Sequence, residues 1–388
     1  MPRPRVLRAS ALVIPLLVIA SSSGAAVYQY SAILNPRQEV PLVTSPALGG
    51  GRFVIDTDAN TVRYWISYAG LSAPETAAHI HGYAAAGVNA AVVHPLPAGN
   101  PKVGVWNYAE ADEPAILAGR TYANIHSAGF PGGEIRGQIV PFNALLGASQ
   151  EIPVNASAGT GWAIATIDTA LKQLNYYVFY EGLSGAPTAS HFHGTANYGI
   201  NAGVKIPIPV GPSPMTGSTP YLAADEDAIL SGRWYVNIHT AANPGGEIRG
   251  QLVPRVVPMD AQQEVPANGA ITSAGFGLVE IDTAANVLGY DVRVVSLSAP
   301  ETAAHIHGFA DPGVNAGVQQ PIAPVPGAQK LGTWTYGAAN ETDVLLGRTY
   351  FNVHTAAFPG GEIRGQIQSL PGEQAVLGVA VVQLGADG

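Results

Sequence analysis

The sequence predicts an all-β protein made of three tandem domains, each an antiparallel Greek-key β-sandwich or barrel. One set of motifs occurs three times, at intervals of about 113 residues. Within each interval, short stretches rich in aromatic and β-branched residues end at Gly, Pro or Ser, as strands do. No stretch keeps a helical pattern beyond one or two turns, and the best of them lies at residues 115–118.

The repeats are defined by motifs that return in the same order. Gln-Glu-Val-Pro at residues 38–41 returns, with one conservative change, at 150–153 and 263–266. Each repeat closes on Gly-Gly-Glu-Ile-Arg-Gly-Gln, at residues 132–138, 245–251 and 360–366. The predicted boundaries are 1–26 for a leader, 28–142, 143–256 and 257–370 for the repeats, and 371–388 for a tail. These units are far longer than solenoid repeats, so we expect each to fold alone, as beads on a string.

Within a repeat, the hydrophobic pattern has the period of two that is typical of strands. It predicts strands at residues 62–68, 176–180 and 288–295, which are rich in Tyr, Val and Leu. Residues 121–127 and 134–140 flank a Pro-Gly-Gly turn, which predicts a β-hairpin.

The N-terminal residues have the three-part layout of a secretory signal peptide. Arg3, Arg5 and Arg8 precede an apolar run at residues 11–20, and small residues follow at 21–26. An apolar run of this length is about half of the roughly 20 residues that a membrane-spanning helix needs. We therefore expect a mature chain that is extracellular or periplasmic and has no transmembrane span. Cysteine is absent, so no disulfide stabilises the domains.

Composition and motifs exclude several function classes. The formal net charge is -9, and no cluster of Lys or Arg follows residue 8, so nucleic acid is not an expected partner. The sequence has no nucleophile elbow, no phosphate-binding Gly-rich loop, no His-Glu-x-x-His helix and no Cys nucleophile, so we predict no enzymatic activity. Much Ala, Gly and Pro with little Lys favours a bacterial source.

Histidine is the residue type that could carry chemistry. Because residues two apart in a strand point to the same face, both His of each His-x-His motif should project together, opposite Ile80, Phe192 or Ile306. We expect them on an outward polar face of the sandwich, next to a third His from a neighbouring strand. The candidate ligands are His79, His81 and His126 in the first repeat, His191, His193 and His239 in the second, and His305, His307 and His354 in the third.

More than one role fits these histidines. Three imidazoles could bind copper or zinc and leave one coordination position open. They could instead fix loops by hydrogen bonds, or bind another ligand, and the sequence leaves these alternatives open. His94, in a Pro-rich loop of the first repeat, is a candidate fourth ligand, and Glu134 with Arg136 is predicted to form an ion pair on the polar face. The Trp residues are expected to pack in the cores, although exposed aromatic residues could bind sugars.

The repeated motifs resemble those of the CHRD domain family, which occurs in chordin and in many secreted bacterial proteins. The resemblance rests on Ala-His-Ile-His-Gly, Gly-Val-Asn, Leu-x-Gly-Arg-x-Tyr-x-Asn-x-His and Pro-Gly-Gly-Glu-Ile-Arg-Gly-Gln, and it covers residues 28–370. It implies a fold and an extracellular setting. It does not imply chordin's antagonism of growth factors, because the Cys-rich modules of chordin are absent.

The expected fold is also broadly similar to the sandwich of the copper-zinc superoxide dismutases, which place a His-x-His strand outside a Greek-key barrel. No bridging His recurs in all three repeats, no zinc-site Asp is evident and Cys is missing, so no dismutase is predicted. The predicted function is a non-enzymatic array that binds an extracellular protein or an envelope polymer. The alternative is an extracytoplasmic copper- or zinc-binding protein with one three-His site per repeat.

Overall fold

A computed structural model describes residues 26–268, 272–324 and 326–371. The predicted signal peptide, apart from Ala26, and the predicted tail, apart from Pro371, lie outside the described residues. Strands dominate the described part of the chain, and the helices there are single short turns, so the prediction of an all-β fold is confirmed. Within that part, no helix is long and apolar enough to cross a membrane.

Each repeat contains eight strands and one short α-helix in the same order. The first repeat has β1 (Val27–Leu34), β2 (Leu48–Asp56), β3 (Thr61–Ala69), β4 (Glu75–Gly82), β5 (Ala91–Pro95), β6 (Lys102–Asn107), α1 (Glu113–Leu117), β7 (Thr121–Ser127) and β8 (Ile135–Ile139). The second has β9 (Phe142–Gly147), β10 (Thr160–Asp168), β11 (Gln173–Glu181), β12 (Pro187–Gly194), β13 (Val204–Pro207), β14 (Met215–Pro220), α2 (Glu226–Leu230), β15 (Trp234–Thr240) and β16 (Ile248–Leu252). The third has β17 (Arg255–Asp260), β18 (Ala274–Asp282), β19 (Val287–Val295), β20 (Glu301–Gly308), β21 (Val318–Pro321), β22 (Gln329–Thr335), α3 (Glu341–Leu345), β23 (Thr349–Thr355) and β24 (Ile363–Ile367).

The strand order is the same in every repeat and is of the Greek-key type. In the first repeat the order is β5-β4-β7-β8 in one sheet and β1-β2-β3-β6 in the other, and antiparallel bridges join β8 to β1. The second and third repeats form the same order as continuous eight-stranded sheets, β13-β12-β15-β16-β9-β10-β11-β14 and β21-β20-β23-β24-β17-β18-β19-β22. Consecutive strands such as β3 and β4 lie in opposite halves, so the chain crosses between the halves, as a Greek key requires.

The two halves of each repeat enclose a core of their own. In the first repeat, Phe53 and Ile55 of β2 pack with Ile80 of β4 and Ile125 of β7. The predicted hairpin is confirmed, since β7 pairs antiparallel with β8. Trp106, Trp234 and Trp334 lie in the three domain cores, as predicted. Trp162 is buried in a separate cluster with Val140 of the first repeat, and Trp65 is half-buried.

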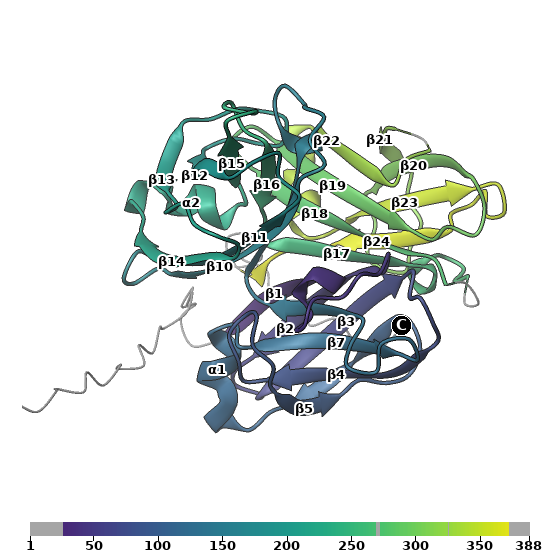
Figure 1. Cartoon of the computed structure of the whole chain (residues 1–388). Helices are drawn as coiled ribbons and strands as arrows, with labels where there is room; N and C mark the ends of the chain where they lie inside the picture. Colours follow the sequence, from purple (N-terminus) through teal and green to yellow (C-terminus); the bar gives the residue numbers. More distant parts are fainter. Residues whose placement is uncertain (1–25, 269–271, 325, 372–388) are drawn as a thin grey trace, which may run out of the picture.

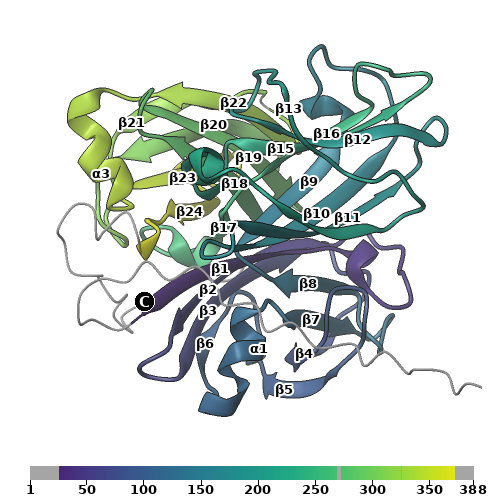
Figure 2. The ribbon, with the colours of Figure 1, turned by 90° about the vertical axis from the view of Figure 1, so that its left-hand side faces the viewer.

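The prediction that the repeats are beads on a string is wrong. The first strands of the three repeats, β1, β9 and β17, contact one another, and β17 also packs on β2. Figure 2 shows β17 lying directly above β1 and β2. A fourth apolar cluster, outside the three domain cores, combines Ile33 of the first repeat, Tyr198 of the second, and Val256 and Phe276 of the third. Apolar residues on the outer faces of these strands, such as Ile33 and Val256, are thus removed from water by the contacts between repeats.

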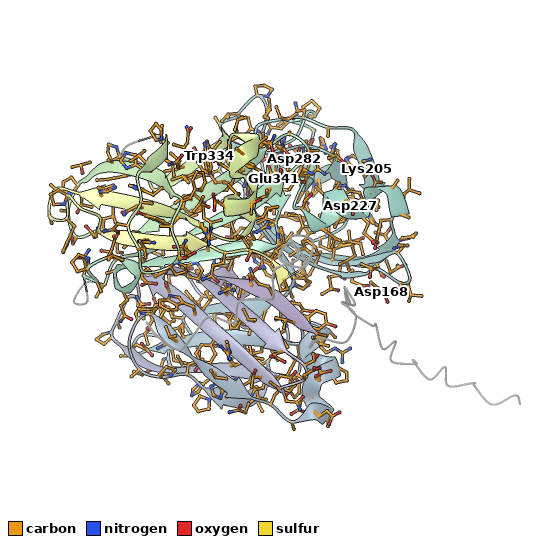
Figure 3. The ribbon with its side chains drawn as sticks, turned by 180° about the vertical axis from the view of Figure 1, so that it is seen from behind. Asp168, Lys205, Asp227, Asp282, Trp334 and Glu341 are labelled. Atoms are coloured by element: carbon orange, nitrogen blue, oxygen red, sulfur yellow. The ribbon has the colours of Figure 1, made fainter. Side chains whose placement is uncertain are left out.

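Buried polar contacts reinforce the contacts between repeats. Between the second and third repeats, the Glu280 carboxylate accepts hydrogen bonds from the Tyr198 backbone N–H at 2.7 Å and from Gln251 Nε2 at 2.8 Å. Arg233 forms an ion pair with Asp282 at 3.0 Å, and Figure 3 places Asp282 where these two repeats meet. The three repeats therefore form one compact body, seen in Figure 1.

Asp260 connects the third repeat to the first. Its Oδ2 accepts hydrogen bonds from Trp65 Nε1 at 2.7 Å and Ser67 Oγ at 2.6 Å, and the side chain is buried. Asp260→Ala should lower the free energy of unfolding by about 1–3 kcal/mol, because it leaves buried donors without an acceptor. Urea unfolding followed by Trp fluorescence measures this change, with exposed Asp58→Ala as the control. Equal stability of the two variants would show that Asp260 does not hold the repeats together.

Candidate metal centres

The alternation of β4 places the two His of the first His-x-His motif on one face. Ile80, between them, is fully buried in the core, so the predicted orientation is confirmed. β7 runs antiparallel to β4, with Asn124 opposite His79 and Tyr122 opposite His81. His126, two residues beyond Asn124 on the same face of β7, therefore lies beside His79.

The three imidazoles of each repeat converge. In all three sets, one nitrogen from each His lies within 4.8 Å of the others. His79 Nδ1 lies 3.3 Å from His126 Nε2, and the equivalent distances are 3.3 Å for His191 to His239 and 3.2 Å for His305 to His354. Nine of the ten histidines, from strands far apart in sequence, thus form three nearly identical clusters.

In the first repeat, backbone carbonyls select the tautomers of two of the three imidazoles, those of His81 and His126. His81 Nδ1 lies 2.9 Å from the Ala90 carbonyl oxygen, and His126 Nδ1 lies 2.9 Å from that of Pro131. A carbonyl can only accept, so Nδ1 carries the hydrogen and Nε2 keeps its lone pair. Nε2 of His81, and likewise of His193 and His307, is buried without a hydrogen-bond partner among the described residues.

The surroundings of His79 and His81 lower the pKa of both imidazoles. Burial lowers the pKa of His79, and the neighbouring His126 imidazole lowers it further. Burial likewise lowers the pKa of His81, against the opposing effect of the Ala90 carbonyl, and the positive charge of Arg136 adds to the lowering. A lowered pKa favours the neutral imidazole, which is the form that binds metals.

The His81 ring is the first member of a stack of three side chains, followed by Tyr122 and Arg136. This ring is parallel to that of Tyr122, with the centroids 4.9 Å apart, and the Arg136 guanidinium lies 3.4 Å from the centroid of Tyr122. The same stack recurs as His193, Tyr235 and Arg249, and as His307, Tyr350 and Arg364. Sequence reasoning missed this role of Tyr and Arg, although both recur at fixed positions in every repeat.

One nitrogen pair of each cluster has the spacing of ligands in a zinc or copper site. Two nitrogens that bind one tetrahedral Zn²⁺ at about 2.0–2.1 Å lie roughly 3.3 Å apart, which matches the His79–His126 distance. Imidazole nitrogen suits Zn and Cu, and carbonyl groups that orient the far ring nitrogens are typical of metal-binding His. Three protein ligands leave a fourth position for water or another donor.

Two predictions about the polar face of the first repeat are corrected by the structure. This face is not outward, because Asn124, Arg136 and Gln138 are at most 4% exposed. Loops cover it: Arg136 donates to the Val88 carbonyl at 2.9 Å, and Gln138 donates to that of Ala84 at 3.0 Å.

The predicted ion pair between Glu134 and Arg136 is not formed. Glu134 instead accepts hydrogen bonds from Ser45 Oγ at 2.5 Å and the Ser72 backbone N–H at 2.7 Å, and the pKa of its carboxyl is lowered by such bonds in spite of burial. Glu134 precedes β8 and faces the loops that contain Ser45 and Ser72. Arg136 instead stacks on Tyr122.

His94 does not join the first cluster. It pairs with Ile80 across β5 and β4, so its side chain shares the core-facing side of the sheet, opposite His79 and His81. There it lies 3.3 Å from the Tyr64 hydroxyl and stacks on Trp106.

Comparison with known proteins places the repeats in a family. The sequence profile of the CHRD domain matches residues 30–139, 142–252 and 256–367, three tandem copies. The chain belongs to the CHRD domain family. Each CHRD repeat contributes one three-His cluster.

Two curated relatives share part of this sequence. Chordin of Danio rerio is 32% identical over 165 residues, which is 36% of this chain and 17% of that protein. Chordin of Xenopus laevis is 31% identical over 170 residues, 37% of this chain and 17% of that protein. The CHRD chain thus matches less than a fifth of the length of either relative. No solved structure is significantly similar to it.

Proposed function

We propose that this protein is an extracytoplasmic copper- or zinc-binding protein that holds one ion in each CHRD repeat. The observation that carries the proposal is the threefold convergence of His nitrogens within 4.8 Å. A purely structural role for the histidines needs hydrogen-bond partners for their nitrogens, and Nε2 of His81, His193 and His307 has none in the described structure. The signal-peptide pattern at residues 1–26 supports a location outside the cytoplasm.

Each side chain of the first repeat has a separate task. His79, His81 and His126 would hold the ion, through Nδ1 of the first and Nε2 of the other two. The Ala90 and Pro131 carbonyls orient the two rings that bind through Nε2. A bound Zn²⁺ or Cu²⁺ would supply a Lewis acid with one open coordination position.

A metal titration of the mature protein tests the proposal. We expect three equivalents of Zn²⁺ per chain, bound with closely similar affinity because the three clusters have nearly the same geometry. Calorimetric titration of protein stripped with a chelator and then dialysed measures the stoichiometry. The proposal would be overturned if the protein bound no metal. It would also be overturned if the bound metal per chain stayed the same after the histidines of all three clusters were replaced.

A second candidate function is that of a non-enzymatic array that binds an extracellular protein or an envelope polymer. Membership of the CHRD family and the similarity to chordin favour it. Each repeat also exposes two aliphatic side chains at equivalent positions: Val88 and Val92, Ile200 and Val204, Val314 and Val318. Exposed apolar groups that recur mark a surface suited to contact, and three copies would raise avidity. Co-sedimentation with isolated cell envelopes tests this role, and it can coexist with metal binding.

A further inference from the structure

The Gln-Glu-x-Pro motif of every repeat places a buried carboxyl against the strand that carries the third His. Glu39, Glu151 and Glu264 are 4%, 4% and 6% exposed and each follows a short 3-10 helix. Each lies against an Asn of that strand: Asn124, Asn237 and Asn352. The Gln-Glu-x-Pro motif supplies none of the candidate metal ligands, although its partner Asn124 lies opposite His79 across β7 and β4.

Each Glu and its Asn form one hydrogen bond where two are possible. The amide Nδ2 of Asn donates to one carboxyl oxygen of Glu, at 3.4 Å in all three repeats. The other two oxygens, Oε1 of Glu and Oδ1 of Asn, are buried with no hydrogen-bond partner in the described part of the chain. This pattern of two orphaned acceptors is the same in the three repeats: Glu39 with Asn124, Glu151 with Asn237, and Glu264 with Asn352.

A glycine shows that the two side chains of each pair lie against the same point. A Cβ on Gly133 would lie 2.6 Å from Asn124 Oδ1 and 2.7 Å from Glu39 Oε1. A Cβ on Gly361 would lie 2.6 Å from both Asn352 Oδ1 and Glu264 Oε1. A Cβ on Gly246 would lie 2.7 Å from Asn237 Oδ1 and 2.6 Å from Glu151 Oε2, the oxygen that accepts from Asn237. Two acceptors that are adjacent and buried repel each other unless a hydrogen lies between them.

No cation neutralises these carboxyls directly. In the described structure, no nitrogen of Lys, Arg or His lies within ion-pair distance of Glu39, Glu151 or Glu264. The nearest cation in the first repeat, Arg136, directs its N–H groups to Asn89, Val88 and Gln138 instead. An ionised carboxylate in this position would therefore be buried without a direct partner of opposite charge.

We propose that each of these Glu–Asn pairs is a proton-binding site, occupied in weakly acidic solution and emptied as the pH rises through neutrality. The neutral carboxyl donates its O–H to the Asn Oδ1 and accepts the Asn Nδ2–H at its other oxygen, which closes a two-bond ring. One proton thereby satisfies both orphaned oxygens. The pair joins the Gln-Glu-x-Pro turn to the strand that carries His126, His239 or His354.

The electrostatics of the pairs agree with the geometry. Burial raises the pKa of Glu39, Glu151 and Glu264 to about 7 in each case. The positive charges of Arg136, Arg249 and Arg364 and the Asn amides act in the opposite direction, and Asp260 raises the pKa of Glu264 further. These are the charged groups that face the three carboxyls.

The proton makes the stability of the fold depend on pH in a defined direction. The carboxyl pKa is about 7 in the folded protein and about 4.5 when the side chain is free, so the folded state holds more protons between these values. Stability should therefore fall as pH rises from about 4.5 to about 7 and become flat with respect to these groups above that range.

Carbon-13 NMR of the mature protein labelled at the Glu side-chain carboxyl carbon tests the proposal. We expect three carboxyls, one per repeat, to titrate near pH 7. Glu39→Gln, which mimics the neutral acid, should fold and remove one of these titrations while leaving the other two. Glu151→Gln and Glu264→Gln should each remove another, and the exposed Glu110→Gln should remove none of the three.

The experiment has to separate the three Glu–Asn pairs from Glu280, and it has to give an answer even if a Gln variant does not fold. Glu280, whose pKa is raised by burial to about 8 at the contact between repeats, is distinguished because none of these substitutions removes its titration. If a Gln variant fails to fold, the count of neutral-range Glu titrations in the parent protein still decides, because the three pairs and Glu280 together give four and Glu280 alone gives one. Carboxyl carbons of these three residues that stay at the ionised position from pH 5 to 8 would overturn the proposal and point to a water or cation between the oxygens. The test uses metal-free protein, so its outcome is independent of the proposed metal sites.

Discussion

Replacing His81 with Ala should lower the Zn²⁺ bound per chain from three equivalents to two. His81 contributes the Nε2 atom that is buried and has no hydrogen-bond partner among the described residues, and two remaining imidazoles form a much weaker site. The second and third clusters draw their ligands from their own repeats, so their binding should not change. Replacing His193 and His307 as well should abolish binding. Equilibrium dialysis followed by metal analysis measures each stoichiometry.

His94→Ala is the matched control for this series. It removes an imidazole from the same repeat, but one that faces the core beside Tyr64 and Trp106. Three equivalents should remain bound. Three equivalents in the His81 variant too would show that the cluster is not a metal site, and His79→Ala repeats the test if the His81 variant does not fold.

Gly133→Ala should destabilise the protein by at least about 2 kcal/mol. The φ angle of Gly133 is 129°, a conformation that side chains with a Cβ rarely adopt and that costs on the order of 1–3 kcal/mol. The added Cβ would also lie 2.6 Å from Asn124 Oδ1 and 2.7 Å from Glu39 Oε1, so the buried pair would have to separate. Urea unfolding measures the loss.

The preceding residue gives the control for this substitution. A Cβ on Gly132 would meet nothing within 4 Å, and its φ is not positive, so Gly132→Ala should change stability little. If the two variants were equally stable, the close approach at Gly133 would not matter to the fold. The second Gly of the Pro-Gly-Gly turn, and not the first, is thus the one that the structure requires in the first repeat.

The sequence was sufficient to predict what strand alternation controls. The period of two places His79 and His81 together and Ile80 in the core, and the structure agrees. The hairpin of β7 and β8 and the short helix near residues 115–118 were also predictable, because turn residues and local pattern determine them.

Contacts between repeats were not predicted, although the apolar sequence of β18 could have indicated them. Every residue of β18 is buried, including Phe276 and Leu278 in the cluster between repeats. A strand covered on both faces tends to have a nearly continuous apolar sequence, but no strand was predicted at the residues of β18. The loops over the polar face were also not predicted. Their contacts with His81 and His126 are made by the backbone carbonyls of Ala90 and Pro131, and a backbone group does not require a particular residue type.

The central claim is that three imidazoles of each CHRD repeat bind one ion directly. X-ray absorption spectroscopy of the Zn²⁺-loaded protein tests it without any substitution, because the three sites have the same ligand set and contribute one averaged spectrum. The account predicts about three imidazole nitrogens per zinc at about 2.0–2.1 Å, with the outer-shell scattering of imidazole rings. A first shell of oxygen atoms without imidazole scattering would contradict it.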